Sequence, residues 1–161
     1  MRGMKTGAGV LALCLLAAPT QAQVVEKKAL TLAAAKTIAA AAESEAKARG
    51  ARVVIAVVDE GGYLLLLERL DDTQVASVEV GIGKARTAAI FRRPSKVFED
   101  QVREGRVAAL GLPGATPLQG GVPIWVDGKV IGAIGVSGET PAEDEAIALK
   151  GAEAAKSWDS K

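Results

Sequence analysis

Lys84 and Thr87 are polar residues on one predicted helix, and both could do chemistry there. Lys84 stands in the middle of a largely apolar segment, and Thr87 follows it by nearly one helical turn. Val80 and Phe91 share this helix face with them at helical spacing. A lysine in such a place either extends its charge to solvent or holds an anionic group at a ligand pocket.

The composition excludes several kinds of enzyme. The chain has 161 residues and no histidine, which excludes Ser-His-Asp and Cys-His catalytic sets, an imidazole base and histidine ligation of zinc or haem. It has 20 Lys and Arg against 19 Asp and Glu, so no basic surplus is available to neutralise phosphates. We therefore expect no nucleic-acid partner.

Residues 1–22 have the pattern of a secretory signal peptide. Arg2 and Lys5 precede an apolar run over 10–18, and Thr20 and Ala22 are small residues placed before a cleavage site. The alternative is a short membrane anchor, but the run is shorter than the roughly 18–20 residues of a membrane span. We expect cleavage after Ala22 and a periplasmic or secreted protein without a membrane span.

Cleavage would leave one domain, residues 23–161, with few groups that bind iron. The single Cys and both Met lie within residues 1–22, so the remaining 139 residues contain no His, Cys or Met. The domain would have no disulfide in an oxidising compartment. Iron could then be held only by Tyr63, by carboxylates or by weaker oxygen and amine donors.

The periodicity of apolar residues indicates which elements position these groups. Local signals mark some of the ends: Gly50 ends a helix, Asp127-Gly128 turns a hairpin, and Thr140 begins a capping box. No strand–helix–strand alternation supports a parallel sheet, so the order indicates an α+β domain with helices packed on one antiparallel sheet. We expect helices over 31–49, 73–91, 94–103 and 141–157, hairpins over 52–70 and 122–136, and an irregular Gly- and Pro-rich segment over 105–121.

Two groups of residues allow both a structural and a functional interpretation. Gly81 and Gly83 either let a neighbouring element pack closely on the helix or make room for a flat ligand, and packing is the more ordinary use. The acidic residues Glu139 and 143–145 either complement the positive end of the last helix or hold a cation, and we favour the first interpretation.

Three segments between Thr31 and Ala155 carry a family resemblance. They are IAVVDEGG at 55–62 with Arg69-Leu70-Asp71, KARTA at 84–88 with Phe91 and Arg93-Pro94, and GGVPI at 120–124 with DGKVIGAIGVSG at 127–138 and Asp144-Glu145. With these segments the chain resembles the GlcG/HbpS family of haem-binding or haem-degrading proteins, which is related to the C-terminal domain of PduO-type proteins. The third segment is the most specific.

The resemblance implies a fold and an assembly. The fold would be a profilin-like, three-layer α/β/α arrangement with a five-stranded antiparallel sheet flanked by helices. Members of the family form homo-oligomers, and a homo-oligomer is expected here. Residues 63–67 are apolar on both faces, so this strand has to be covered by helices or by another subunit.

The resemblance also implies a haem- or tetrapyrrole-binding protein that serves haem or iron sensing or sequestration. Thr87 matches a position where a threonine ligand is proposed in a related protein. Tyr63 is the better iron ligand chemically, because a tyrosinate can hold ferric haem. Lys84 or Arg92 would pair with a haem propionate.

An enzyme or accessory subunit that acts on a small organic acid is the alternative function. Lys84 would then anchor the carboxylate or act as an acid or base, and Gly120, Gly121 and Ser137 would line its pocket. A third interpretation is an oligomer with a purely structural role. Because the sequence has no obvious catalytic set, we expect binding rather than catalysis.

Overall fold

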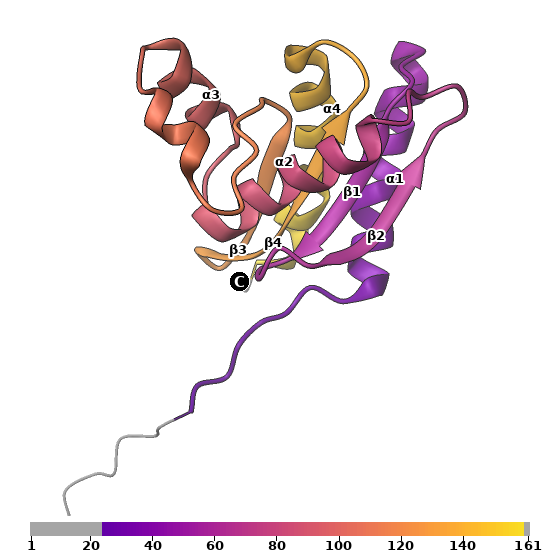
Figure 1. Ribbon diagram of the computed structural model, residues 1–161. Helices are drawn as coiled ribbons and strands as arrows, with labels where there is room; N and C mark the ends of the chain where they lie inside the picture. The colour runs from indigo at the N-terminus through magenta and orange to yellow at the C-terminus, as the bar shows by residue number, and fades with distance from the viewer. Residues whose placement is uncertain (1–23, 160–161) are drawn as a thin grey trace, which may run out of the picture.

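Two β-hairpins form the sheet of this protein in a computed structural model that describes residues 24–159. The predicted signal peptide lies outside these residues. The first hairpin pairs β1 (Val54–Asp59) with β2 (Leu64–Arg69), and the second pairs β3 (Gly121–Val126) with β4 (Lys129–Ser137). β1 and β4 pair antiparallel, which gives the order β2-β1-β4-β3 (Figure 1).

The described residues form four strands, so the expectation of a five-stranded sheet is wrong. From residue 96 to residue 120 the chain folds as α3 (Lys96–Arg103), a 3-10 helix η1 (Val107–Gly111) and an irregular loop. Residues 111–120 are rich in Gly and Pro. Proline cannot donate a ladder hydrogen bond and glycine loses much entropy on ordering, so this segment is a poor strand.

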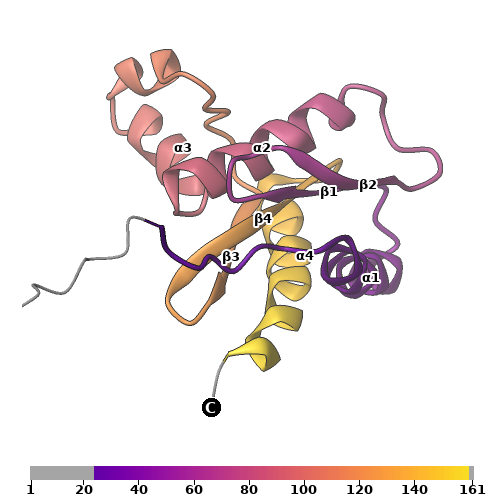
Figure 2. The ribbon, with the colours of Figure 1, turned by 90° about the horizontal axis from the view of Figure 1, so that it is seen from below.

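Three longer helices cover the sheet on both faces. α1 (Leu32–Arg49) and α4 (Pro141–Glu153) pack on one face, and α2 (Ser77–Phe91) packs on the other (Figure 2). After α4 the chain continues as a 3-10 helix, η2 (Ala154–Trp158). This arrangement confirms the α+β class. No helix within residues 24–159 is long and apolar enough to cross a membrane.

Most helix and turn ends lie where the local signals predict them. Gly50 ends α1 in the left-handed conformation with φ of 67°, and Thr140 forms the capping box with Glu143. Asp127 and Gly128 both have positive φ, of 48° and 69°, as a type I′ hairpin turn requires.

Two helices begin later than predicted. α2 begins at Ser77 rather than at residue 73, because Asp72 adopts a left-handed conformation and the carbonyl of Thr73 accepts hydrogen bonds from Arg69. α3 begins at Lys96 instead of Pro94.

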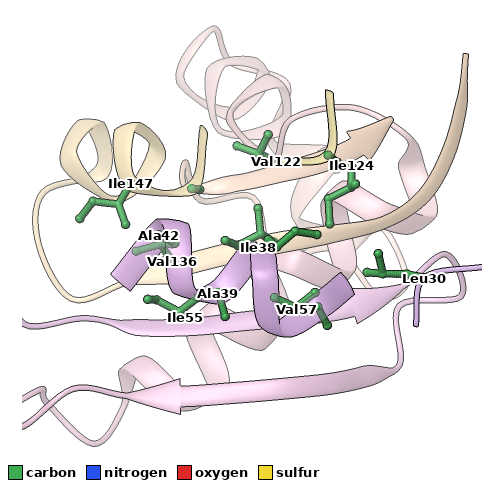
Figure 3. Packing of buried hydrophobic residues seen from close by; sticks show 14 of the residues in the cluster. Leu30, Ile38, Ala39, Ala42, Ile55, Val57, Val122, Ile124, Val136 and Ile147 are labelled. Carbon is green, nitrogen blue, oxygen red and sulfur yellow. The ribbon is translucent and has the colours of Figure 1, made fainter. Parts of the chain in front are cut away.

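The core is divided unequally between the two faces of the sheet. The larger cluster lies under α1 and α4 and includes Ile38, Ile55 and Ile147 (Figure 3). The cluster under α2 consists mainly of alanines, such as Ala85 and Ala88. Small side chains allow α2 to lie close to the sheet, and this close approach places the middle of α2 directly over β4.

Candidate functional site

Lys84 lies inside the protein and not at its surface. Its side chain projects from the middle of α2, and the residue is only 4% exposed. The Nζ atom donates a hydrogen bond to Asp144 Oδ2 at 2.7 Å and another to the carbonyl oxygen of Val136 at 3.0 Å. Protein groups therefore satisfy the charge of Lys84, which is neither solvated nor open to a ligand in this structure.

Asp144 is the partner that sequence reasoning missed. It lies in the first turn of α4 and is buried with Lys84, and its Oδ1 accepts a hydrogen bond from the backbone N–H of Glu139 at 3.0 Å. Burial raises the pKa of the Asp144 carboxyl above its ordinary value, and the hydrogen bond and charge of Lys84 offset part of that effect. Asp144 thus binds Lys84 as well as complementing the helix terminus.

A sequence signal for Asp144 does exist. Residue 144 occupies the same helical stripe as Ile147, Ala148 and Gly151, all of which are buried. A carboxylate on the apolar face of an amphipathic helix requires a buried partner. Lys84, on the apolar middle of another helix, is the complementary signal.

Gly120 and Gly121 allow the loop before β3 to approach this ion pair. Gly120 has φ of +124°, and a Cβ there would lie 2.9 Å from Lys84 Nζ and 2.8 Å from the carbonyl oxygen of Val136. A Cβ on Gly121 would collide with the backbone carbonyl of Lys84. The two glycines are therefore packing positions around Lys84.

Ser137 is next to Val136 on β4 but faces a different partner. It is buried, and its hydroxyl donates to the Ser77 hydroxyl at 3.4 Å. The structure thus brings Gly120, Gly121 and Asp144 around Lys84, and we call these four residues the Lys84 cluster. The Ser137 hydroxyl belongs to a neighbouring contact.

Thr87 connects α2 by hydrogen bonds to the loop between η1 and β3, which we call the long loop. Its hydroxyl donates to the carbonyl oxygen of Gly83 at 2.8 Å and accepts from the backbone N–H of Thr116 at 2.7 Å. The residue is fully buried. An iron atom could reach this oxygen only if both hydrogen bonds were broken and the loop moved away.

The two α2 glycines serve close packing, as favoured from the sequence. A Cβ on Gly83 would collide with the Thr116 side chain, and one on Gly81 would lie 3.2 Å from a methyl group of Val54. The loop and the sheet therefore occupy the space in which a flat ligand would have to lie.

The side chains of Phe91 and Arg92, at the end of α2, have different surroundings. The Phe91 ring packs against Phe98 of α3, with centroids 4.8 Å apart. Arg92 adopts a left-handed conformation with φ of 53°, a position where glycine is the usual residue. Such a conformation costs about 1–2 kcal/mol for a non-glycine residue.

Arg92 lines a pocket at one end of the sheet, which we call the turn-end pocket. Its volume is about 390 Å³. The β1–β2 turn, the β3–β4 hairpin, the C-terminal end of α2 and the segment before α1 form its walls. The lining includes Lys27, Glu60, Ala89, Arg92, Trp125 and Lys129.

Tyr63 lies on the β1–β2 turn and is 73% exposed. Its backbone N–H donates to Asp59 Oδ1, and the preceding residue, Gly62, packs against Arg86 and Ile90 of α2. Among the described residues, the Tyr63 phenol has no hydrogen-bond partner. Of the two candidate iron ligands, Tyr63 is therefore open to solvent and Thr87 is enclosed by the protein.

No group of three or more Cys, His, Asp or Glu within residues 24–159 is arranged to hold a metal ion. The acidic residues that begin α4 instead bind neighbouring groups. Glu139 accepts from the backbone N–H of Arg52, Glu143 closes the capping box, and Glu145 accepts from Gln119.

Comparisons with known proteins identify relatives of this chain. It is 48% identical to protein GlcG of Escherichia coli K12 over 103 residues, which are 64% of this chain and 77% of GlcG. Its fold matches a double mutant of Streptomyces reticuli HbpS with a TM-score of 0.75 and 32% identity, over 85% of this chain and 96% of that structure. A PduOC:Heme complex matches with a TM-score of 0.72 and 27% identity, over 79% of this chain and 95% of that structure.

The family profile gives the same answer over most of the chain. The profile described as "Haem degrading protein HbpS-like" matches residues 30–153. This range contains both hairpins, all four α-helices, and the whole Lys84 cluster. The resemblance seen in the sequence is thereby confirmed, and the chain belongs to the HbpS-like family.

Proposed function

We propose that this chain is an exported haem- or tetrapyrrole-binding protein that serves haem or iron sensing or sequestration. The observation that carries the proposal is its likeness to the PduOC:Heme complex, at a TM-score of 0.72. Membership of the HbpS-like family supports it.

Tyr63 is the residue that fits the iron of such a ligand. The chain contains no histidine, and Tyr63 is its only tyrosine. The phenol is exposed, whereas the Thr87 hydroxyl is enclosed by the loop that it holds. A tyrosinate is an established haem ligand, and bound haem would supply a redox-active iron. Tyr63 would therefore be the residue that holds the iron of a bound haem.

Titration of the purified protein with haemin tests this assignment. We expect a saturable Soret shift with the charge-transfer absorption of a ferric tyrosinate. Tyr63→Phe keeps the ring and removes only the hydroxyl, so it should weaken binding at least tenfold and abolish the charge-transfer band. Tyr63→His should restore binding with an imidazole-type spectrum.

Two results of the titration would contradict the proposal. A Soret shift no larger than that of an unrelated hydrophobic protein would overturn haem binding. A normal shift and normal charge-transfer band in Tyr63→Phe would overturn the ligand assignment alone. Because Tyr63 is the only tyrosine, no other phenol could produce that band.

Export is the second part of the proposal and rests on the pattern of residues 1–22. Cleavage after Ala22 would make Gln23 the first residue of the mature chain. Fractionation of expressing cells and an intact-mass measurement test this. We expect the mature mass in the periplasm or medium, and an uncleaved chain in the cytoplasm would contradict it.

Self-association is the third part and rests on β2, which lies at the edge of the sheet. Leu64 is 46% exposed there, and the next three residues are leucines that are only partly buried. An apolar edge strand with an unpaired backbone edge invites another strand. Light scattering should find an oligomer, and Leu64→Lys should shift it toward the monomer.

The organic-acid alternative would need Lys84 to meet a carboxylate. Its Nζ already meets one, on Asp144, inside the protein. The geometry therefore favours the haem proposal over an enzyme with a Lys84-centred pocket.

A further inference from the structure

The turn-end pocket has the size of a small-ligand site. Its volume of about 390 Å³ falls in the range of ligand pockets, roughly 300–1,000 Å³. It lies where the C-terminal end of α2 meets the β3–β4 hairpin. Nothing in the Lys84 cluster reaches it.

The lining of the pocket combines an aromatic surface with positive charge. Trp125 on β3 is 48% exposed although it is a large aromatic residue, and Ala89 and Val130 add apolar surface beside it. Arg92 and Lys129 line the same pocket. Within residues 24–159 neither of these two cations forms an ion pair or a side-chain hydrogen bond.

The segment before α1 lines one side of the pocket and forms two ion pairs there. Lys27 forms an ion pair with Glu60 on the β1–β2 turn, and Lys28 forms one with Asp127 on the β3–β4 turn. These ion pairs hold the segment at the pocket and neutralise the carboxylates of Glu60 and Asp127. Glu26 also lines the pocket, but the four lining cations, Lys27, Lys28, Arg92 and Lys129, outnumber the two lining acids, Glu26 and Glu60, so the lining keeps a net positive charge.

The backbone of Arg92 supports a role for its side chain. A left-handed residue at the end of a helix is usually glycine, yet an arginine with φ of 53° stands here. Strained backbone conformations cluster at functional sites, and the Arg92 side chain lines the pocket.

We propose that the turn-end pocket binds the carboxylate-bearing edge of a flat ring. Arg92 and Lys129 pair with the carboxylates, and the Trp125 indole packs against the ring. The inference rests on the proposed function, since the propionate edge of a tetrapyrrole is such an edge.

Iron-free protoporphyrin IX tests the pocket separately from iron ligation. Binding is measured by its absorption change in the full chain, and by quenching of Trp125 fluorescence in a Trp158→Phe background. We expect saturable binding that weakens about tenfold in each of Arg92→Gln and Lys129→Gln. The dimethyl ester of the porphyrin, which lacks the carboxylates, should bind at least tenfold more weakly.

Two other cations of the chain serve as matched controls. Arg93 follows Arg92 but stacks over the Phe98 ring, and Lys156 lies on η2 in an ion pair with Glu153. Arg93→Gln and Lys156→Gln should bind protoporphyrin as the parent protein does. Circular dichroism would establish that all four variants remain folded.

Each outcome decides between the two proposals. If protoporphyrin and haemin bind but neither binding depends on Arg92, Lys129 or the free carboxylates, the pocket inference is overturned and haem binding stands. If protoporphyrin binds with these dependences while haemin shows no Tyr63-dependent spectrum, the pocket stands and iron ligation fails. If neither porphyrin binds, both are overturned.

Discussion

Lys84 Nζ and Asp144 Oδ2 are 2.7 Å apart and connect helices on opposite faces of the sheet. Lys84 lies on α2 and Asp144 on α4, and the carbonyl of Val136 on β4 accepts a second hydrogen bond from Lys84. Gly120 completes the enclosure from the loop. The pair thus joins both helical layers, one strand and the loop.

Lys84→Met should destabilise the fold severely. It leaves Asp144 buried without its cation, and removal of one partner of a buried pair costs about 3–5 kcal/mol. Urea denaturation followed by circular dichroism measures the loss. Lys84→Met combined with Asp144→Leu should lose less than the single variant, because no charge is then buried alone. A double variant as unstable as the sum of both singles would contradict this coupling.

Thr87→Val should separate stability from ligand binding. The valine has nearly the same shape but leaves the backbone N–H of Thr116 without its acceptor, at a cost of about 1–3 kcal/mol. Thermal denaturation should show the loss, whereas haemin affinity of the folded variant should stay within about twofold. If the haemin affinity of Thr87→Val fell tenfold or more, Thr87 rather than Tyr63 would be the iron ligand.

Gly83→Ala should displace the long loop. Its Cβ would collide with the Thr116 side chain, while Gly111 offers a matched control with no atom near its Cβ. We expect Gly83→Ala to lower the free energy of unfolding by about 1–3 kcal/mol and to expose the loop to proteolysis. Gly111→Ala should change both measurements little, and equal effects of the two substitutions would show that the Thr116 contact is unimportant.

Local signals predicted the elements well and the tertiary pairings poorly. Gly50, Asp127-Gly128 and the Thr140 capping box mark ends that depend only on neighbouring residues. The pairing of Lys84 with Asp144 joins residues 60 positions apart, and no local preference encodes it.

The expected fifth strand and the turn-end pocket illustrate two other limits. The family resemblance predicts a fifth strand that the described residues do not form, whereas the irregular segment predicted over 105–121 is present apart from the short helix η1. The sequence predicts a ligand-pairing role for Arg92, but Trp125 and Lys129 come near it only because the β3–β4 hairpin brings them to the end of α2. The two charges and the aromatic surface form one site only because the tertiary fold brings these three residues together.

Glu68→Gln should stabilise the protein at neutral pH. Glu68 lies on β2 facing α1, and its Oε2 is buried with no hydrogen-bond partner in the described chain. Burial raises the pKa of this carboxyl above its ordinary value of 4.5, and the charge of Glu43 adds to the effect. The folded protein therefore holds the Glu68 proton more tightly than the unfolded chain does.

The sign of the pH dependence follows from this raised pKa. Well below pH 4.5 the group is protonated in both states and costs nothing, and stability falls as the pH rises through 4.5 and the higher folded pKa. Glutamine resembles the protonated form, so Glu68→Gln should raise the free energy of unfolding by about 1 kcal/mol at pH 7 and by much less at pH 4. Denaturant titrations at both pH values measure the difference, with the exposed Glu104→Gln as control. An equal gain at both pH values would mean that the effect does not arise from ionisation of Glu68.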